Sequence, residues 1–251
     1  MIARRSCSRS VSTLPAALLL VGLLRAQETA SPSAAEVFGA AVGRLAALIE
    51  PSAGAAPKTL SATLRLTEAE GLGRDLAGRS AQMAFQAPDK LTVTIEIEGR
   101  ELQAGRNGQE LWVFAPGKKF GVVGLPEVPR FRTRPDSVDR TPLPPFKLPL
   151  PREQLLLLPL MFQLESLPAE RVGDAPCRVV RGRPQPQARE ALKLPEGEFT
   201  LWVRESDSLP VRLRLADTRG RRVTLEAADL ALSEPWPAQA WRLQAANRFT
   251  I

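Results

Sequence analysis

Apolar side chains recur with two different periods along the chain, and the period changes near residue 59. Before that point they recur every three or four residues, which predicts one amphipathic helix over 33–50. These apolar positions are Val37, Phe38, Ala41, Val42, Leu45, Leu48 and Ile49. Ser33 and Glu36 have the spacing of a capping box at the start of the helix, and Pro51 ends it.

Beyond residue 59 apolar and polar side chains alternate, which predicts antiparallel strands with one apolar and one polar face. The clearest segments are 59–67, 81–86, 91–98, 199–204, 211–215 and 223–227, with shorter ones at 101–105, 109–115, 119–123 and 177–181. Asn107-Gly108 is a tight-turn signal between two of them. We expect 9 to 11 strands in one domain.

Two segments interrupt the strand pattern. Residues 125–151 contain eight prolines together with Arg130, Arg132 and Arg134, and proline cannot donate a ladder hydrogen bond. We therefore expect a crossing loop there. An apolar segment follows within 152–166, and Gln154–Leu164 is expected to be helical with a break near Pro159. A second, Pro/Gln-containing loop is expected at 184–187.

A sheet with one apolar face must be covered, and two helices are a thin cover for so many strands. The pattern is compatible with an α+β fold, mostly antiparallel β, in which a curved, unclosed half-barrel carries helices over an apolar concave face. Such a fold would leave an apolar hollow. The same residues could instead fill a dry core, and the pattern alone leaves both readings open.

Residues 1–26 have the features of a secretory signal peptide: Arg4, Arg5 and Arg9, then an apolar run at 14–24. We expect cleavage after Ala26, a periplasmic location and a single domain over 27–251; an uncleaved membrane anchor is the alternative. Removing this segment takes away four arginines and no acid, so the net charge falls from +7 to +3. A nucleic-acid partner is therefore not expected.

The residue inventory argues against catalysis. The chain has no histidine and no tyrosine, which removes the commonest general base and most zinc sites. It has no Gly-rich phosphate loop and no paired Cys motif. Cys177, left alone after cleavage, cannot form an internal disulfide and is expected to be buried and inert. We expect no enzyme activity, no cofactor and no metal site.

Several motifs resemble the outer-membrane lipoprotein carrier (LolA-like) superfamily. Pro88–Leu91 matches a Pro-x-Lys/Arg-apolar strand start, and Asn107–Pro116 matches a following hairpin with a central tryptophan. Residues 199–232, with Leu209-Pro210, are similar to a later strand pair of these proteins. The resemblance covers roughly 33–245 and implies a half-barrel that shelters acyl chains without catalysis. The 125–151 segment and the Leu91–Thr94 strand depart from the family pattern, which indicates a divergent member.

The residues and the resemblance together predict a periplasmic carrier or binder of lipid or lipoprotein acyl chains, acting as a monomer. The expected cavity wall is Leu64, Met83, Phe85, Leu91, Val93, Ile95, Leu111, Val113, Leu201, Leu213 and Leu225. The expected plug is Leu156, Leu157, Leu160 and Met161, and Arg65 is considered as a gating arginine. The alternative is an envelope sensor or scaffold that binds a protein partner through the arginines of the 125–151 loop.

Overall fold

The computed structural model describes residues 31–72, 76–97, 99–115, 120–124, 146–148, 151–193, 196–243 and 248–250. The expected signal peptide and most of the proline-rich 125–151 segment, with its three arginines, lie outside these residues. Residues Ser33–Ile251 form one compact unit. No helix among the described residues is long and apolar enough to cross a membrane.

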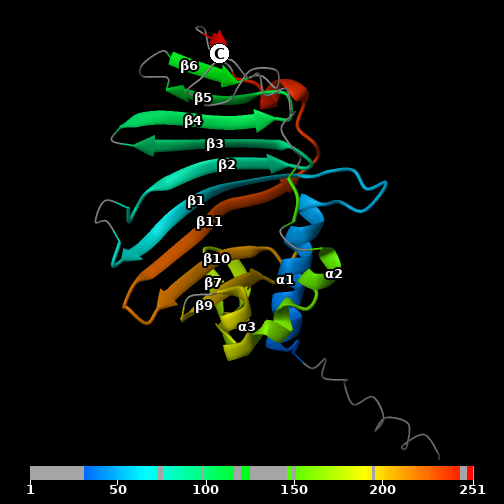
Figure 1. The fold of residues 1–251 in the computed structure, drawn as a ribbon, viewed down its shortest axis with the longest axis vertical. Helices are drawn as coiled ribbons and strands as arrows, with labels where there is room; N and C mark the ends of the chain where they lie inside the picture. Colours follow the sequence, from blue (N-terminus) through cyan, green and yellow to red (C-terminus); the bar gives the residue numbers. More distant parts are fainter. Residues whose placement is uncertain are drawn as a thin grey trace, which may run out of the picture. The chain divides into compact units, whose positions relative to one another are not determined.

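One open sheet of twelve strands dominates this unit (Figure 1). The strands are β1 (Thr59–Glu70), β2 (Ser80–Gln86), β3 (Lys90–Ile97), β4 (Arg100–Asn107), β5 (Leu111–Ala115), β6 (Phe120–Gly124), β7 (Phe162–Val172), β8 (Ala175–Pro184), β9 (Gly197–Arg204), β10 (Pro210–Asp217), β11 (Arg222–Ser233) and β12 (Arg248–Thr250). Their order across the sheet is β12-β6-β5-β4-β3-β2-β1-β11-β10-β9-β8-β7.

The curved sheet does not close, because β12 and β7 remain at its two edges. Every neighbouring pair is antiparallel except β12 and β6, which are parallel. The α+β, mostly antiparallel and unclosed architecture is thus as predicted. The twelve strands compare with about 9 to 11 expected. The short β12 carries no alternation signal, and the start of β7 had been assigned to a helix.

The helical segments are α1 (Ala34–Ile49), α2 (Arg152–Leu155), α3 (Pro186–Leu192) and the 3₁₀ turns η3 (Leu158–Met161) and η4 (Ala238–Trp241). At the start of α1 the Ser33 hydroxyl accepts from the Glu36 amide, and the Glu36 carboxylate accepts from the Ser33 amide at 2.7 Å. The predicted helix and its capping box are confirmed.

Two local predictions were wrong. Phe162–Leu164 is not helical: it opens β7, because Phe162 pairs with Pro184 and Leu164 with Gly182 across the edge of the sheet. The 184–187 segment is not a plain loop, since Gln185 precedes α3 and Pro186 is its first residue. Proline suits a first helical position because the amide it lacks would have no partner there.

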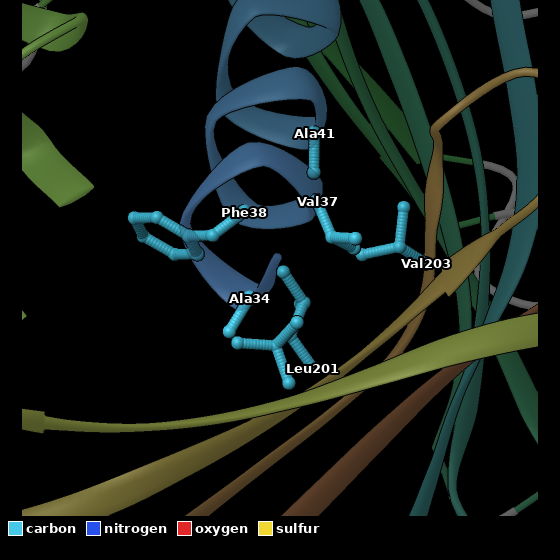
Figure 2. Close-up of a cluster of buried hydrophobic side chains, with 7 residues drawn as sticks. Ala34, Val37, Phe38, Ala41, Leu201 and Val203 are labelled. Carbon is cyan, nitrogen blue, oxygen red and sulfur yellow. The ribbon is translucent and has the colours of Figure 1, made fainter. Parts of the chain in front are cut away.

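The main core lies where α1 packs on the sheet. Figure 2 shows Val37 of α1 beside Val203 and Ala34 beside Leu201, and Ala41 belongs to the same buried cluster. Phe38 points sideways and contacts Phe162 and Phe199. Helix α1 contacts β7, β8 and β9 in particular, at the end of the sheet away from β6. The helix therefore covers only part of the apolar face.

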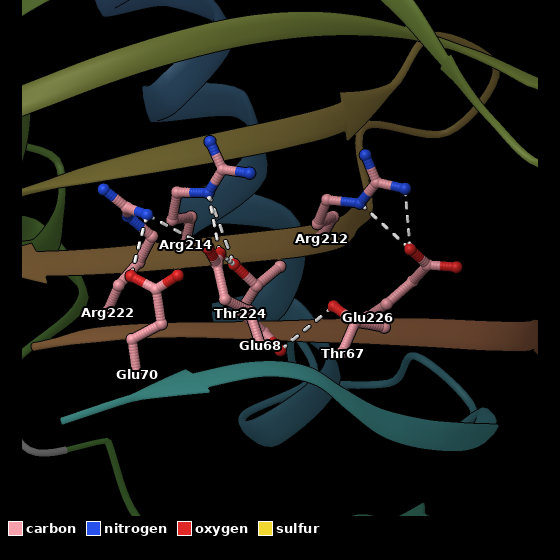
Figure 3. A network of polar contacts seen from close by, with 8 residues as sticks. All are labelled: Thr67, Glu68, Glu70, Arg212, Arg214, Arg222, Thr224 and Glu226. Atoms are coloured by element: carbon pink, nitrogen blue, oxygen red, sulfur yellow. Dashed lines mark hydrogen bonds and ion pairs between the residues drawn. The ribbon is translucent and has the colours of Figure 1, made fainter. Parts of the chain in front are cut away.

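The opposite face of the sheet carries charged side chains in cross-strand rows (Figure 3). Arg212 on β10 binds Glu226 on β11 at 2.7 Å. Glu68 on β1 accepts from Thr224 at 2.6 Å and lies 3.3 Å from Arg214. These pairs join three neighbouring strands across the polar face.

Candidate ligand-binding face

All eleven predicted wall residues project from one face of the sheet. Strand register establishes this, because directly paired residues project to the same side. One row pairs Met83 with Val93, then Ala104, then Val113. A second row, on β11, β10 and β9, pairs Leu225 with Leu213 and then Leu201. The alternation in the sequence therefore identified a continuous apolar face.

The described part of the chain leaves much of this face accessible. Among its large apolar side chains, Ile97 and Val113 are 40% exposed, Leu215 49% and Leu225 36%. The α1 end is covered and buried, whereas the strands from β10 to β5 receive little helical cover among the described residues. Accessible apolar surface of this kind is characteristic of interaction and ligand-binding sites.

A hollow of about 400 Å³ opens at one end of the apolar face, beside the ends of β7 to β11. Its apolar lining is Leu72, Phe162, Pro184, Phe199, Leu215 and Val223. None of the fifteen predicted site residues lines it. The signal was nevertheless in the sequence, because Phe199, Leu215 and Val223 alternate in phase with Leu201, Leu213 and Leu225.

The charged side chains at the rim of the hollow are paired with one another. Arg183 binds Glu198 at 2.7 Å, Arg189 binds Glu196 at 2.8 Å, and Arg221 binds Asp217 at 2.6 Å. Partial burial would raise the pKa of Asp217, but hydrogen bonds from Arg221 and Arg219 outweigh it and hold this pKa below its usual value. The hollow thus presents apolar surface inside a rim of neutralised charges.

The predicted plug residues do not fill this space. Leu156, Leu157 and Leu160 are 64%, 55% and 71% exposed, and Met161 is half-buried. Leu155, the one leucine in the single turn of α2, is buried, and Leu158 of η3 packs against the α1 core. The three exposed leucines form an apolar surface of their own.

Two arginines occupy unlike positions. Arg65, considered as a gating residue, is exposed and lies on the polar face, in register with Glu226. Arg106, which the sequence did not single out, lies on the apolar face between Leu91 and Leu111. Its guanidinium stacks 4.5 Å above the Phe146 ring, and Phe146 in turn contacts Phe85 at 5.4 Å. Phe146 therefore covers this part of the apolar face.

Cys177 is fully buried at the start of β8, as predicted, within a cluster that includes Val179 and Trp202. Burial raises the pKa of its thiol, which disfavours the reactive thiolate. Within the described residues, no group of three or more His, Cys, Asp or Glu side chains has the proximity that a metal ion needs.

No protein-family model and no curated protein matches the chain. Among solved structures it is similar to the complex of MucA and MucB from Pseudomonas aeruginosa, with a TM-score of 0.47 and 11% identity over 84% of this chain and 60% of that one. It is also similar to an uncharacterized conserved protein from Thermus thermophilus, with a TM-score of 0.45 and 13% identity over 86% and 98% of the two chains.

A LolA superfamily protein from Nitrosomonas europaea is similar at a TM-score of 0.30, with 14% identity over 85% of this chain and 99% of that one. These TM-scores and sequence identities are too low to indicate a function for this chain. A functional proposal therefore has to be argued from the residues of the chain itself. The chain resembles LolA superfamily proteins in its motifs, and such a protein is also among the solved structures to which it is similar.

Proposed function

We propose that this chain is a non-catalytic, periplasmic binder of acyl chains from lipids or lipoproteins. The observation that carries the proposal is the continuous apolar face, which runs from β5 to β9 and is only partly covered by α1. A flexible hydrocarbon chain fits such a surface because burial of each CH₂ contributes about 0.8 kcal/mol without specific polar contacts.

The hollow beside Phe199 and Leu215 supports the same ligand class. Its interior is apolar, and the charges at its rim are paired, so a ligand head group would not meet an uncompensated charge there. In the proposed complex, one end of the acyl chain enters this hollow and the remainder lies along the apolar face toward Val93. The LolA-like motifs in the sequence agree with this ligand class.

The test is native mass spectrometry of the gently purified protein, followed by titration with a fluorescent fatty acid. Co-purified adducts of lipid mass, removed by organic extraction, are expected. Val93→Glu should abolish retention of the adducts because it places a charge in the middle of the apolar face. Thr92→Glu, on the adjacent position of β3 but on the polar face, is the matched control and should bind normally.

A second pair of variants separates the hollow from the rest of the face. Leu215→Glu should weaken binding if the hollow receives the chain, whereas Arg214→Gln, its neighbour on the polar face, should not. A folded Val93→Glu protein that retains lipid, or a wild-type protein that neither carries adducts nor binds the fatty acid, would overturn the proposal.

An envelope scaffold is the second candidate, and the exposed leucines in the segment from the end of α2 to η3 favour it. Leu156, Leu157 and Leu160 present apolar surface that an apolar patch on an envelope protein would bury. Replacing all three by serine should abolish capture of such a partner and leave fatty-acid titration unchanged. Loss of fatty-acid binding in this variant would instead place the leucines over the ligand.

A further inference from the structure

A groove lies on the other face of the sheet, away from the proposed acyl-binding face; its surface is mainly polar over β2 to β4 and more apolar than polar over β1 to β3. One part of it, about 280 Å³, lies over β1 to β3, and a second part, about 450 Å³, extends over β2 to β4. Gln82 and Thr94 line both parts, so the two are continuous. The hydroxyl-bearing lining residues are Ser61, Thr63, Ser80, Thr92 and Thr94.

An indole ring stands at one end of this groove and is held there by buried contacts. The Trp236 amide donates to the Thr59 hydroxyl at 3.1 Å and to the Gln86 side chain at 3.0 Å. Thr59 and Gln86 are themselves buried and bonded to each other at 2.8 Å. The Trp236 ring packs against the buried Trp241 ring at 5.5 Å, yet it remains partly exposed and lines the groove.

A β-bulge in β11 places the carboxylate of Asp229 in the lining of the groove. Between the pairs Ser61–Ala231 and Thr63–Ala228, β11 has one residue more than β1, which is a β-bulge. Asp229 lies in this bulge with φ of 53°, a left-handed conformation that costs a non-glycine residue energy. The Asp229 side chain lines the groove and lies 3.5 Å from the Thr63 hydroxyl. Strained residues of this kind are concentrated at functional sites.

The charge and hydrogen-bonding character of the groove restrict its ligand. Its described lining includes Asp229, Glu96 and Glu101 but neither Lys nor Arg, which disfavours anions. Within the described residues, no hydrogen bond engages the side chains of Ser61, Thr92 and Thr94. These hydroxyls and carboxylates can exchange hydrogen bonds with ligand hydroxyls, while the indole can pack on an apolar ring face.

We infer that this groove binds a neutral oligosaccharide. A pyranose ring offers C–H groups on its face and hydroxyls around its edge, which matches an indole platform beside a row of hydroxyl, amide and carboxylate groups. Trp236 holds the terminal sugar ring, and Thr92, Thr94 and Gln82 hydrogen-bond to the next rings along β3 and β2. The inference is independent of acyl binding, because the two sites occupy opposite faces of the sheet.

The test is calorimetric titration of the purified protein with cellotetraose and with chitotetraose, and with tetragalacturonate as an anionic comparison. Saturable binding of at least one neutral tetrasaccharide is expected, and tetragalacturonate should bind more weakly. Thr92→Val and Thr94→Val should each weaken this binding about fivefold, the effect of one lost hydrogen bond. Thr67→Val, on β1 but outside the lining of the groove, is the matched control.

Trp236→Ala should abolish sugar binding. Because this variant also removes the packing on Trp241, the valine variants keep the test decisive if Trp236→Ala fails to fold. The inference is overturned if neither neutral tetrasaccharide binds, if Thr92→Val and Thr94→Val bind as tightly as the wild type, or if tetragalacturonate binds at least as tightly. Unchanged fatty-acid titration in Thr94→Val would show that the acyl-binding face is intact in the same preparation.

Discussion

Asp207 secures the turn between β9 and β10 through one of the least exposed ion pairs among the described residues. Arg204 donates to the Asp207 carboxylate from Nε at 3.0 Å and from Nη2 at 2.7 Å, and the Leu209 amide donates at 3.2 Å. Partial burial would raise the pKa of Asp207, but these hydrogen bonds, with the positive charge of Arg204 and Arg44, hold it below its usual value of 3.8.

A carboxylate with a lowered pKa in the folded state makes stability depend on pH in a defined direction. The contribution of the ionised Asp207 carboxylate to stability is complete well above pH 3.8. It is lost as the pH falls through the lower pKa that this carboxylate has in the folded protein. We predict that Asp207→Asn unfolds at lower urea concentration than the wild type at neutral pH. The difference in unfolding free energy should begin to shrink near about pH 4, as Asp207 of the unfolded wild-type chain becomes protonated, and should vanish once the pH lies below the lower pKa of the folded protein. A difference that stays constant down to acid pH would contradict this role.

At the scale of elements, the packing of α1 decides which part of the apolar face becomes core. Phe38 of α1 contacts Phe162 and Phe199 with ring centroids 5.7 and 5.4 Å away, and those two rings lie 5.3 Å from each other. Phe199 also lines the hollow. The three rings therefore join α1, β7 and β9 and form the floor between the dry core and the open hollow.

Phe38→Ala should lower the free energy of unfolding by about 3 to 5 kcal/mol, the range for truncation of a buried aromatic side chain. Urea denaturation followed by far-UV circular dichroism measures this change. Leu45→Ala, on the same helix, is the control: Leu45 is 36% exposed, so its truncation should cost much less. Equal losses in the two variants would mean that the three-ring cluster does not anchor α1.

Local signals in the sequence predicted most of these elements, and tertiary pairing explains the exceptions. The capping box at Ser33 and the alternation in β1, β2, β3 and β9 to β11 depend only on neighbouring residues. The helical expectation for Phe162–Leu164 failed because pairing with β8 outweighs the helix propensity of a leucine-rich segment. The hollow was missed because its lining residues come from the ends of distant strands: the alternation identifies the face on which they lie but does not show that these ends meet.

At the scale of the whole compact unit, one sheet presents two chemically different surfaces. Alternation places a continuous apolar surface on one face, whereas the other carries Arg–Glu pairs, hydroxyls and tryptophans beside a smaller buried cluster that includes Cys177 and Val179. Because α1 covers only one end of the apolar face, folding leaves apolar area that a ligand can still bury. If acyl chains bind there as proposed, the free energy of binding adds to the stability of this fold.

Ligand binding should consequently raise the thermal stability of the protein, and the gain in unfolding free energy should grow with the logarithm of the ratio of free ligand concentration to Kd. At a free fatty-acid concentration about one hundred times Kd, the folded state gains about 2.7 kcal/mol, provided that the unfolded chain does not bind. We expect delipidated wild-type protein to show a rise in Tm with added palmitate, measured by calorimetry below the micelle-forming concentration. Thr92→Glu should retain this rise and Val93→Glu should lose it, since only the second variant changes the apolar face. An equal rise in both variants would place the fatty acid elsewhere than on the face formed by β5 to β9.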